Sequence, residues 1–97
     1  MAVWTVGMWV ARPGNEEAFV EAWSRLARWG EQRFHTQPPV LLRDREQPNR
    51  FVTAGPWPHD AAIETFRGSK EFVEALAEIR PLLESFQPMT LDEVGWA

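Results

Sequence analysis

The sequence predicts an α+β fold of the ferredoxin-like type, in which two helices cover one face of a four-stranded antiparallel sheet. Two observations support this prediction. Segments with strand and helix periodicity follow one another in the order β-α-β-β-α-β, and the second helical segment is broken. The first strand is apolar on both of its faces, which predicts that the far face of the sheet is covered as well. Because the 97 residues contain no repeat or linker, we expect one domain spanning residues 1–97.

The first strand is expected from Val3 to Ala11. Its alternating faces carry Trp4, Val6, Met8 and Val10 on one side and Val3, Thr5, Gly7 and Trp9 on the other. A strand with one face in water would alternate between apolar and polar residues. Helices of the same subunit can cover only one face of the sheet. We therefore expect the second face to pack against the sheet of another subunit, which makes the protein a homodimer.

The first helix is expected to follow the turn Arg12–Gly14, with Asn15 as its N-cap and acidic residues in its first turn. Its amphipathic stripe consists of Ala18, Phe19, Ala22, Trp23, Leu26 and Ala27. We expect this helix to end near Gly30, so that His35 lies in the polar connection Glu31–Pro39.

A hairpin is expected next, formed by a strand over Val40–Arg45, a turn at residues 46–49 and a strand that begins at Arg50. The Gly55–Pro56 pair should end pairing on one side of this strand, because proline has no N–H to donate. Trp57 is therefore expected at the end of the strand, next to the start of a helix.

Asp60 is expected to cap a short helix, and Ser69 to cap a second one. The second carries an apolar stripe formed by Phe72, Val73, Leu76, Ala77, Ile79 and Leu83. Pro81 should kink or divide this helix. The helical region is expected to end at Gln87–Pro88, and the last strand to cover Met89–Trp96.

The composition excludes several classes of function. Six Trp and six Phe occur without any Tyr, so no tyrosine can act as an acid or base, and the absence of Cys excludes disulfides and thiolate chemistry. A net charge of −4 without a basic cluster argues against nucleic acid or an anionic membrane as a partner. No phosphate loop, nucleophile elbow or metal-ligand spacing is present, so we expect no metal and no cofactor. Without a basic leader or a span long enough for a bilayer, we expect a cytoplasmic protein.

Five motifs carry a family resemblance that covers nearly the whole chain. They are Glu-Ala-Phe-Val-Glu-Ala-Trp at 17–23, Leu-Leu-Arg-Asp at 41–44, Arg-Phe-Val-Thr-Ala-Gly-Pro-Trp at 50–57, Lys-Glu-Phe at 70–72 and Arg-Pro-Leu-Leu at 80–83. Together they resemble the antibiotic biosynthesis monooxygenase family of dimeric α+β barrels. The resemblance implies a homodimer whose sheets pack face to face, with a pocket between sheet and helices. The members of this family include cofactor-independent oxygenases of aromatic phenols and quinols, haem-degrading enzymes and proteins without an established activity.

The chain departs from the haem-degrading branch in two places. That branch is expected to carry an asparagine on the first strand, a tryptophan after the third strand and a helical histidine about ten residues later. Trp57 matches the tryptophan, but the first strand has no Asn and Arg67 stands at the histidine position, so haem degradation ranks third. The cofactor-free oxygenases also carry a pocket tryptophan, which Trp57 matches, although no Tyr is present here to hold a phenol.

Aromatic residues are the predicted substrate-binding groups. Trp57 lies at a seam between strand and helix, where pockets tend to form, although a core aromatic that closes the seam is an equal alternative. The predicted pocket residues are Trp57, Trp23, Phe66 and Phe72. The tryptophans on buried stripes, expected in the core or at the dimer interface, are Trp4, Trp9, Trp23 and Trp96.

The predicted catalytic groups are His35, His59 and Arg43. Histidine is the side chain that ordinarily titrates near neutral pH, so His59 or His35 is the expected general base, with a solvated loop histidine as the alternative. Arg43 is the expected stabiliser of a phenolate or enolate oxygen, and otherwise a charge that keeps a strand end soluble. The predicted function is cofactor-independent oxidation of a flat aromatic phenol or quinol with O₂. The alternative is a non-catalytic homodimer that binds a small molecule.

Overall fold

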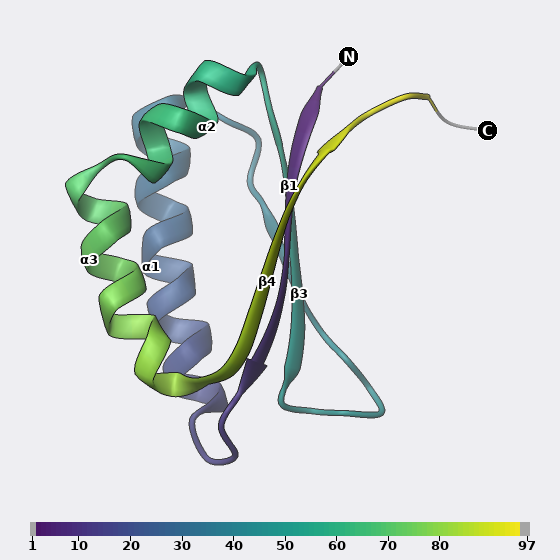
Figure 1. Cartoon of the computed structure of the whole chain (residues 1–97), viewed down its shortest axis with the longest axis vertical. Coiled ribbons are helices and arrows are strands. Elements are labelled where there is room, and N and C mark those ends of the chain that lie inside the picture. Colours follow the sequence, from purple (N-terminus) through teal and green to yellow (C-terminus); the bar gives the residue numbers. More distant parts are fainter. Residues whose placement is uncertain (1, 96–97) are drawn as a thin grey trace.

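The computed structural model describes residues 2–95 and confirms the predicted fold (Figure 1). The strands are β1 (Val3–Ala11), β2 (Val40–Arg43), β3 (Arg50–Trp57) and β4 (Leu83–Asp92). The helices are α1 (Glu16–Phe34), α2 (Asp60–Arg67), α3 (Lys70–Ile79) and the 3₁₀ turn η1 (Arg80–Leu82). The strand order is β2-β3-β1-β4, which places β1 inside the sheet between β3 and β4. Every neighbouring pair of strands is antiparallel.

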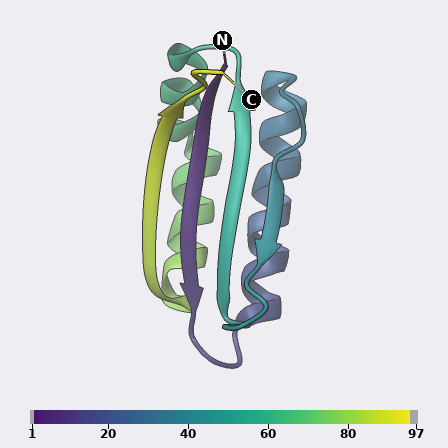
Figure 2. The same ribbon diagram turned by 90° about the vertical axis from the view of Figure 1, so that its right-hand side faces the viewer.

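The molecule has two layers. The helices all lie on one side of the sheet in Figure 1, and Figure 2 looks onto the opposite face, which no element of residues 2–95 covers. The alternation of β1 decides what each face carries: Gly7, Trp9 and Ala11 are buried under the helices. Trp4 and Val6 lie on the uncovered face and are only half-buried.

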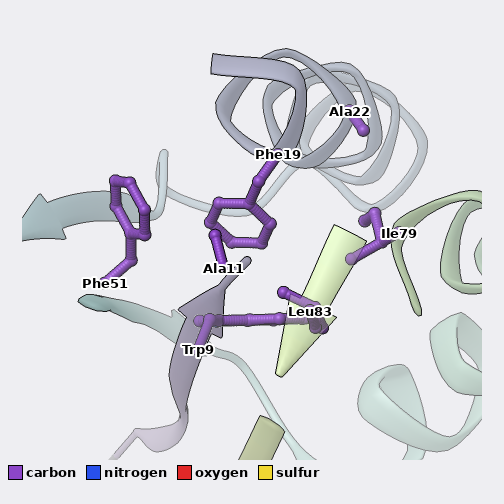
Figure 3. Packing of buried hydrophobic residues seen from close by; sticks show 7 residues of the cluster. All are labelled: Trp9, Ala11, Phe19, Ala22, Phe51, Ile79 and Leu83. Atoms are coloured by element: carbon purple, nitrogen blue, oxygen red, sulfur yellow. The ribbon is translucent and has the colours of Figure 1, made fainter. Parts of the chain in front are cut away.

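The main hydrophobic core lies between α1, α3 and the sheet (Figure 3). Phe19 of α1 packs between Trp9 and Phe51, with ring centroids 5.2 and 5.0 Å from its own. Trp9 also stacks on Phe86 of β4 at 3.8 Å between centroids. Ile79, at the end of α3, is fully buried beside them. Each such side chain stabilises the fold by about 1.5–3 kcal/mol, which makes this cluster the main anchor between the layers.

The helix α1 runs four residues beyond the predicted end at Gly30. It ends at Phe34, and His35 follows in the left-handed conformation with φ 53°. Gly30 is a packing glycine: a Cβ there would lie 3.1 Å from the Phe66 ring, so its absence lets Phe66 approach the helix. Glycine in a helix interior lowers stability by about 1 kcal/mol relative to alanine. Here the packing of Phe66 against the helix offsets this cost.

The last strand begins six residues earlier than predicted. Pro81 lies in η1, which divides the helix from β4 at Leu83 instead of kinking a longer helix. Leu83 continues the helical stripe of Ile79 by spacing, but its pairing with Ala11 of β1 places it in the sheet. The strand ends at Asp92, and the predicted residue Trp96 lies outside the described residues.

Two smaller predictions at the ends of elements were also wrong. The strand β2 ends at Arg43 rather than Arg45, because the turn begins when Asp44 accepts a hydrogen bond from the N–H of Glu46 at 2.8 Å. The N-cap of α2 is His59 rather than Asp60, since His59 Nδ1 accepts from the N–H of Ala62 at 3.3 Å. The predicted Ser69 cap of α3 is confirmed, with its hydroxyl accepting from the N–H of Phe72 at 3.1 Å.

Candidate functional site

A cavity of about 370 Å³ lies between the sheet and the helices. Strands β1 and β3 form its floor, and residues of α1, α3 and the end of α2 form its walls. Its lining is mainly apolar and aromatic, and its volume lies within the usual range for small-molecule sites of roughly 300–1,000 Å³. The cavity can therefore take a compact apolar ligand.

Trp57 is both a pocket wall and a core residue. It is the last residue of β3 and is only 9% exposed. Its ring lies 5.1 Å from that of Phe66 and 5.8 Å from that of Phe34. Its indole Nε1 donates to Thr5 Oγ1 across the sheet at 2.9 Å. The packing and the hydrogen bond together fix the indole at the edge of the cavity.

All four predicted substrate-binding residues line the cavity. Trp57 comes from β3, Trp23 from α1, Phe66 from α2 and Phe72 from α3. Phe66 and Phe72 pack edge to face with centroids 4.9 Å apart, so the α2–α3 corner presents an aromatic wall. The chain thus brings four aromatic side chains from four elements to one hollow.

The three predicted catalytic residues do not line this cavity. His59 is occupied as the cap of α2 and lies in a separate, shallower depression with Arg33 and Phe34. His35 is the C-cap of α1. Arg43 is at the end of the edge strand β2, where its guanidinium lies 5.0 Å from the centre of the Phe51 ring. The structure therefore does not bring these three residues together, and their catalytic roles stay predictions.

Three charged side chains do line the cavity: Glu31 of α1, Arg67 of α2 and Arg80 of η1. Arg67 Nη2 donates to Thr90 Oγ1 at 3.2 Å, and both arginines are exposed. Guanidinium groups stay protonated under physiological conditions, so the rim of the cavity carries positive charge. Glu31 belongs to none of the five motifs, and Arg80 begins the motif at 80–83 without having been predicted as a site residue. Helix α1 contacts η1, and both contribute to the cavity lining.

Sequence reasoning also missed three polar or aromatic residues of the floor. Trp9 lines the cavity as well as the core, and its Nε1 donates to Thr53 Oγ1 at 3.0 Å. Thr5 accepts the equivalent bond from Trp57. The available signal was a five-residue pattern that occurs twice, which corrects the expectation of no repeat: residues 5–9 and 53–57 both read Thr-x-Gly-x-Trp.

Among residues 2–95, no group of three or more His, Cys, Asp or Glu side chains could hold a metal ion. Within the same range, no helix is both long and apolar enough to cross a membrane.

Solved structures with this fold span nearly the full length of the chain. SnoaB, a cofactor-independent oxygenase from Streptomyces nogalater, is similar over 98% of this chain and 95% of its own, with a TM-score of 0.89 and 18% identity. Rv0793 from Mycobacterium tuberculosis is similar over 100% and 99%, with a TM-score of 0.87 and 15% identity. PA3566 from Pseudomonas aeruginosa is similar over 97% and 95%, with a TM-score of 0.84 and 20% identity. At these identities the likeness establishes the fold.

A comparison with curated proteins finds no match. The family model for antibiotic biosynthesis monooxygenases matches residues 2–78, which include β1, β3 and most of the cavity lining. The chain therefore belongs to the antibiotic biosynthesis monooxygenase family.

Proposed function

We propose that this protein is a monooxygenase that oxidises a flat aromatic phenol- or quinol-type molecule with O₂ and uses no metal, flavin or haem. The observation that carries the proposal is the apolar cavity walled by Trp57, Trp23, Phe66 and Phe72. Flat aromatic rings bury well against such side chains, in stacked or edge-to-face contacts. The family and the cofactor-independent oxygenase among the similar structures support the same reaction class.

In the proposed reaction the substrate supplies the electrons. Its deprotonated phenol or enol gives one electron to O₂, and the two radicals combine to form a peroxide on a ring carbon. Cleavage of the O–O bond leaves one oxygen atom on that carbon as a carbonyl, and the other departs as water with two hydrogens of the substrate. One O₂ is consumed, and no external reductant is needed.

The protein's part is to hold and stabilise the anion. The apolar walls exclude water from the reactive intermediates. A negative charge that develops in the cavity would be stabilised by the guanidinium groups of Arg67 and Arg80. Glu31 joins His35 and His59 as a candidate base, since it is the carboxylate in the cavity lining. Arg43 remains a candidate anion stabiliser for test alongside the two rim arginines.

The alternative function is sequestration of a hydrophobic small molecule without chemistry. One observation favours it: among residues 2–95 no histidine lines the cavity, and the carboxylate that does, Glu31, is half-buried. A binding protein needs the aromatic walls but no base.

We also propose that the subunit forms a homodimer through the uncovered face of the sheet. The large apolar side chains there include Val40, Leu42 and Leu91, which are 48%, 55% and 45% exposed. They lie on the same face as half-buried Trp4 and Val6 of β1. Contiguous apolar patches of this kind mark interfaces, and a two-fold axis would let the patch cover itself.

The test is oxygen consumption by the purified, metal-stripped protein with a panel of anthrones and naphthoquinols. Uptake above the autoxidation blank is expected, and Trp57→Ala should lower it by about tenfold or more because the wall is lost. Trp29→Phe is the matched control, since Trp29 lies outside the cavity lining. Unchanged uptake in variants of His35, His59 and Glu31 would remove each as the base. Tight binding with no uptake would instead establish the sequestration function.

A further inference from the structure

The floor of the cavity is built from a repeated motif. Thr5-x-Gly7-x-Trp9 lies on β1 and Thr53-x-Gly55-x-Trp57 on β3. The antiparallel register pairs Thr5 with Gly55 and Gly7 with Thr53, about a centre at the Val6–Ala54 pair. The two motifs are therefore related by a local two-fold axis that runs through the sheet into the cavity.

The two motifs are joined by crossed hydrogen bonds. Trp9 Nε1 donates to Thr53 Oγ1 at 3.0 Å, and Trp57 Nε1 donates to Thr5 Oγ1 at 2.9 Å. Each indole can only donate, so each hydroxyl is fixed as an acceptor and still has its own proton to give. Among residues 2–95 neither hydroxyl donates to a protein group. Thr53 is 7% exposed, and both threonines line the cavity.

The glycines of the motifs make this arrangement possible. A Cβ at Gly7 would lie 2.6 Å from Trp9 Nε1 and 2.9 Å from Thr53 Oγ1. A Cβ at Gly55 would lie 2.9 Å from the Pro39 Cβ. The missing side chain at Gly7 leaves room for Trp9 and Thr53, and the one at Gly55 leaves room for Pro39.

We propose that Thr5 and Thr53 are a pair of hydrogen-bond donors that recognise a planar ligand carrying two acceptor oxygens, of which a quinone-type dione is the simplest. The two threonines are diagonal neighbours on one face of the sheet, about 7–8 Å apart at the backbone, so they can reach oxygens at opposite ends of a ring. A ligand with two equivalent oxygens matches the two-fold symmetry of the floor. This inference rests on the proposed function, because it assumes an aromatic ligand in the same cavity.

The indoles cannot replace the hydroxyls as donors. Each indole N–H is already engaged by its threonine oxygen, at 3.0 Å for Trp9 and 2.9 Å for Trp57, so it is not free to bind a ligand oxygen in the unaltered protein. Removal of a hydroxyl deletes this donor and should therefore weaken oxygen recognition.

Equilibrium dialysis of the full chain with 1,4-naphthoquinone and with naphthalene tests the proposal. Apolar burial alone favours naphthalene, the less polar ring system, whereas a donor pair favours the quinone. We expect the quinone to bind at least about tenfold more tightly, since a net hydrogen bond contributes about fivefold. Thiol addition to the quinone cannot interfere, because the chain has no Cys.

Four variants assign the donors. Thr5→Val and Thr53→Val should each weaken quinone binding by about fivefold more than they weaken naphthalene binding, which reports any displacement of the indole walls. Thr5→Ser and Thr53→Ser keep the hydroxyl and should remain within about twofold of the unaltered protein. Should Thr53→Val fail to fold, the two variants of the more exposed Thr5 and the comparison of quinone with naphthalene still test the proposal.

Equal binding of the two ligands, or quinone binding that ignores both valine substitutions, would overturn the donor pair while leaving an aromatic-binding cavity intact. Binding of neither ligand would overturn both the pair and the proposed function. Quinone binding that depends on the threonines, together with no oxygen uptake, would uphold the pair and reject the oxygenase.

Discussion

The two faces of the sheet are made by the same strands, yet one of them borders a cavity and the other is filled by large side chains. Toward the helices, β1 and β3 alternate threonine, glycine and tryptophan, and a cavity of about 370 Å³ remains above them. Away from the helices, the same strands and their neighbours present apolar side chains such as Trp4, Val6 and Leu42, and no helix of residues 2–95 lies above them. Both faces are apolar, so apolarity alone does not distinguish a ligand site from an interface. Threonine and glycine positions mark the first, and large apolar side chains such as Trp4, Val6 and Leu42 mark the second.

The strongest test of this comparison removes one tryptophan from each face of β1. Trp9→Ala should lower the free energy of unfolding by about 3–5 kcal/mol, because the ring is 5% exposed and packs on Phe19 and Phe86. Trp4→Ala should cost less than half as much in an isolated subunit, since Trp4 is only half-buried and no helix or strand of residues 2–95 packs over its face of the sheet. Urea unfolding in the Leu42→Asp background, described next, gives both values. Equal losses would mean that the two faces are packed alike.

The second test places a charge on the uncovered face. Leu42→Asp should raise the dissociation constant of the proposed dimer by roughly a hundredfold, because a carboxylate would be buried without a partner. Val73→Asp is the matched control: Val73 is 58% exposed on α3, on the helical side of the molecule. Sedimentation equilibrium measures both. Dissociation by the control, or a wild-type protein that is already monomeric, would reject the sheet-face dimer.

The third test fills the floor of the cavity. Gly7→Ala should cost about 1–3 kcal/mol of stability, because the added Cβ would lie 2.6 Å from Trp9 Nε1 and force the indole away from Thr53. Near-ultraviolet circular dichroism should report the displaced indole, and thermal unfolding the loss. Unchanged values for both would show that the floor can relax around a methyl group.

The smallest expected effect lies far from both faces, at the β2–β3 turn. The N–H of Glu46 and the Arg50 guanidinium hold the pKa of Asp44 below its ordinary value. A carboxyl group whose pKa is lowered on folding stabilises the protein above its unfolded pKa of about 3.9, and this contribution disappears as the pH falls through the folded value. Asp44→Asn should therefore lose a small amount of stability at neutral pH and none in strong acid. A difference that persists at low pH would point to the loss of turn geometry instead.

The sequence was sufficient for the features that depend on local chemistry. The two-sided pattern of β1, the break at Gly68 and the Ser69 cap all follow from neighbouring residues and are present in the structure. The start of β4 could not be predicted in this way, because Leu83 fits the helical stripe and only its pairing with Ala11 places it in the sheet.

In the candidate site, too, some features follow from local sequence and others depend on the tertiary structure. Its aromatic wall could be predicted, since Trp57, Phe66 and Phe72 fall on the inner sides of recognisable elements. The histidines were chosen for their chemistry, without any knowledge of position, and the structure places His59 at a helix cap. The Thr5–Trp57 and Thr53–Trp9 bonds join residues 52 and 44 positions apart, so they depend on a strand register that no local pattern specifies.

The position of β1 inside the sheet has a consequence for how the protein can vary. Its odd-numbered residues from Thr5 to Trp9 belong to the ligand face, and its even-numbered residues from Trp4 to Val10 belong to the opposite face. A slip of this strand by one residue would exchange the two sets at once, turning Trp4, Val6 and Met8 toward the hollow and the Thr5 hydroxyl onto the outer face. A single-residue insertion or deletion within β1 would therefore disrupt both faces of the sheet. Within this strand, ligand specificity can change gradually only by substitutions at the odd-numbered positions.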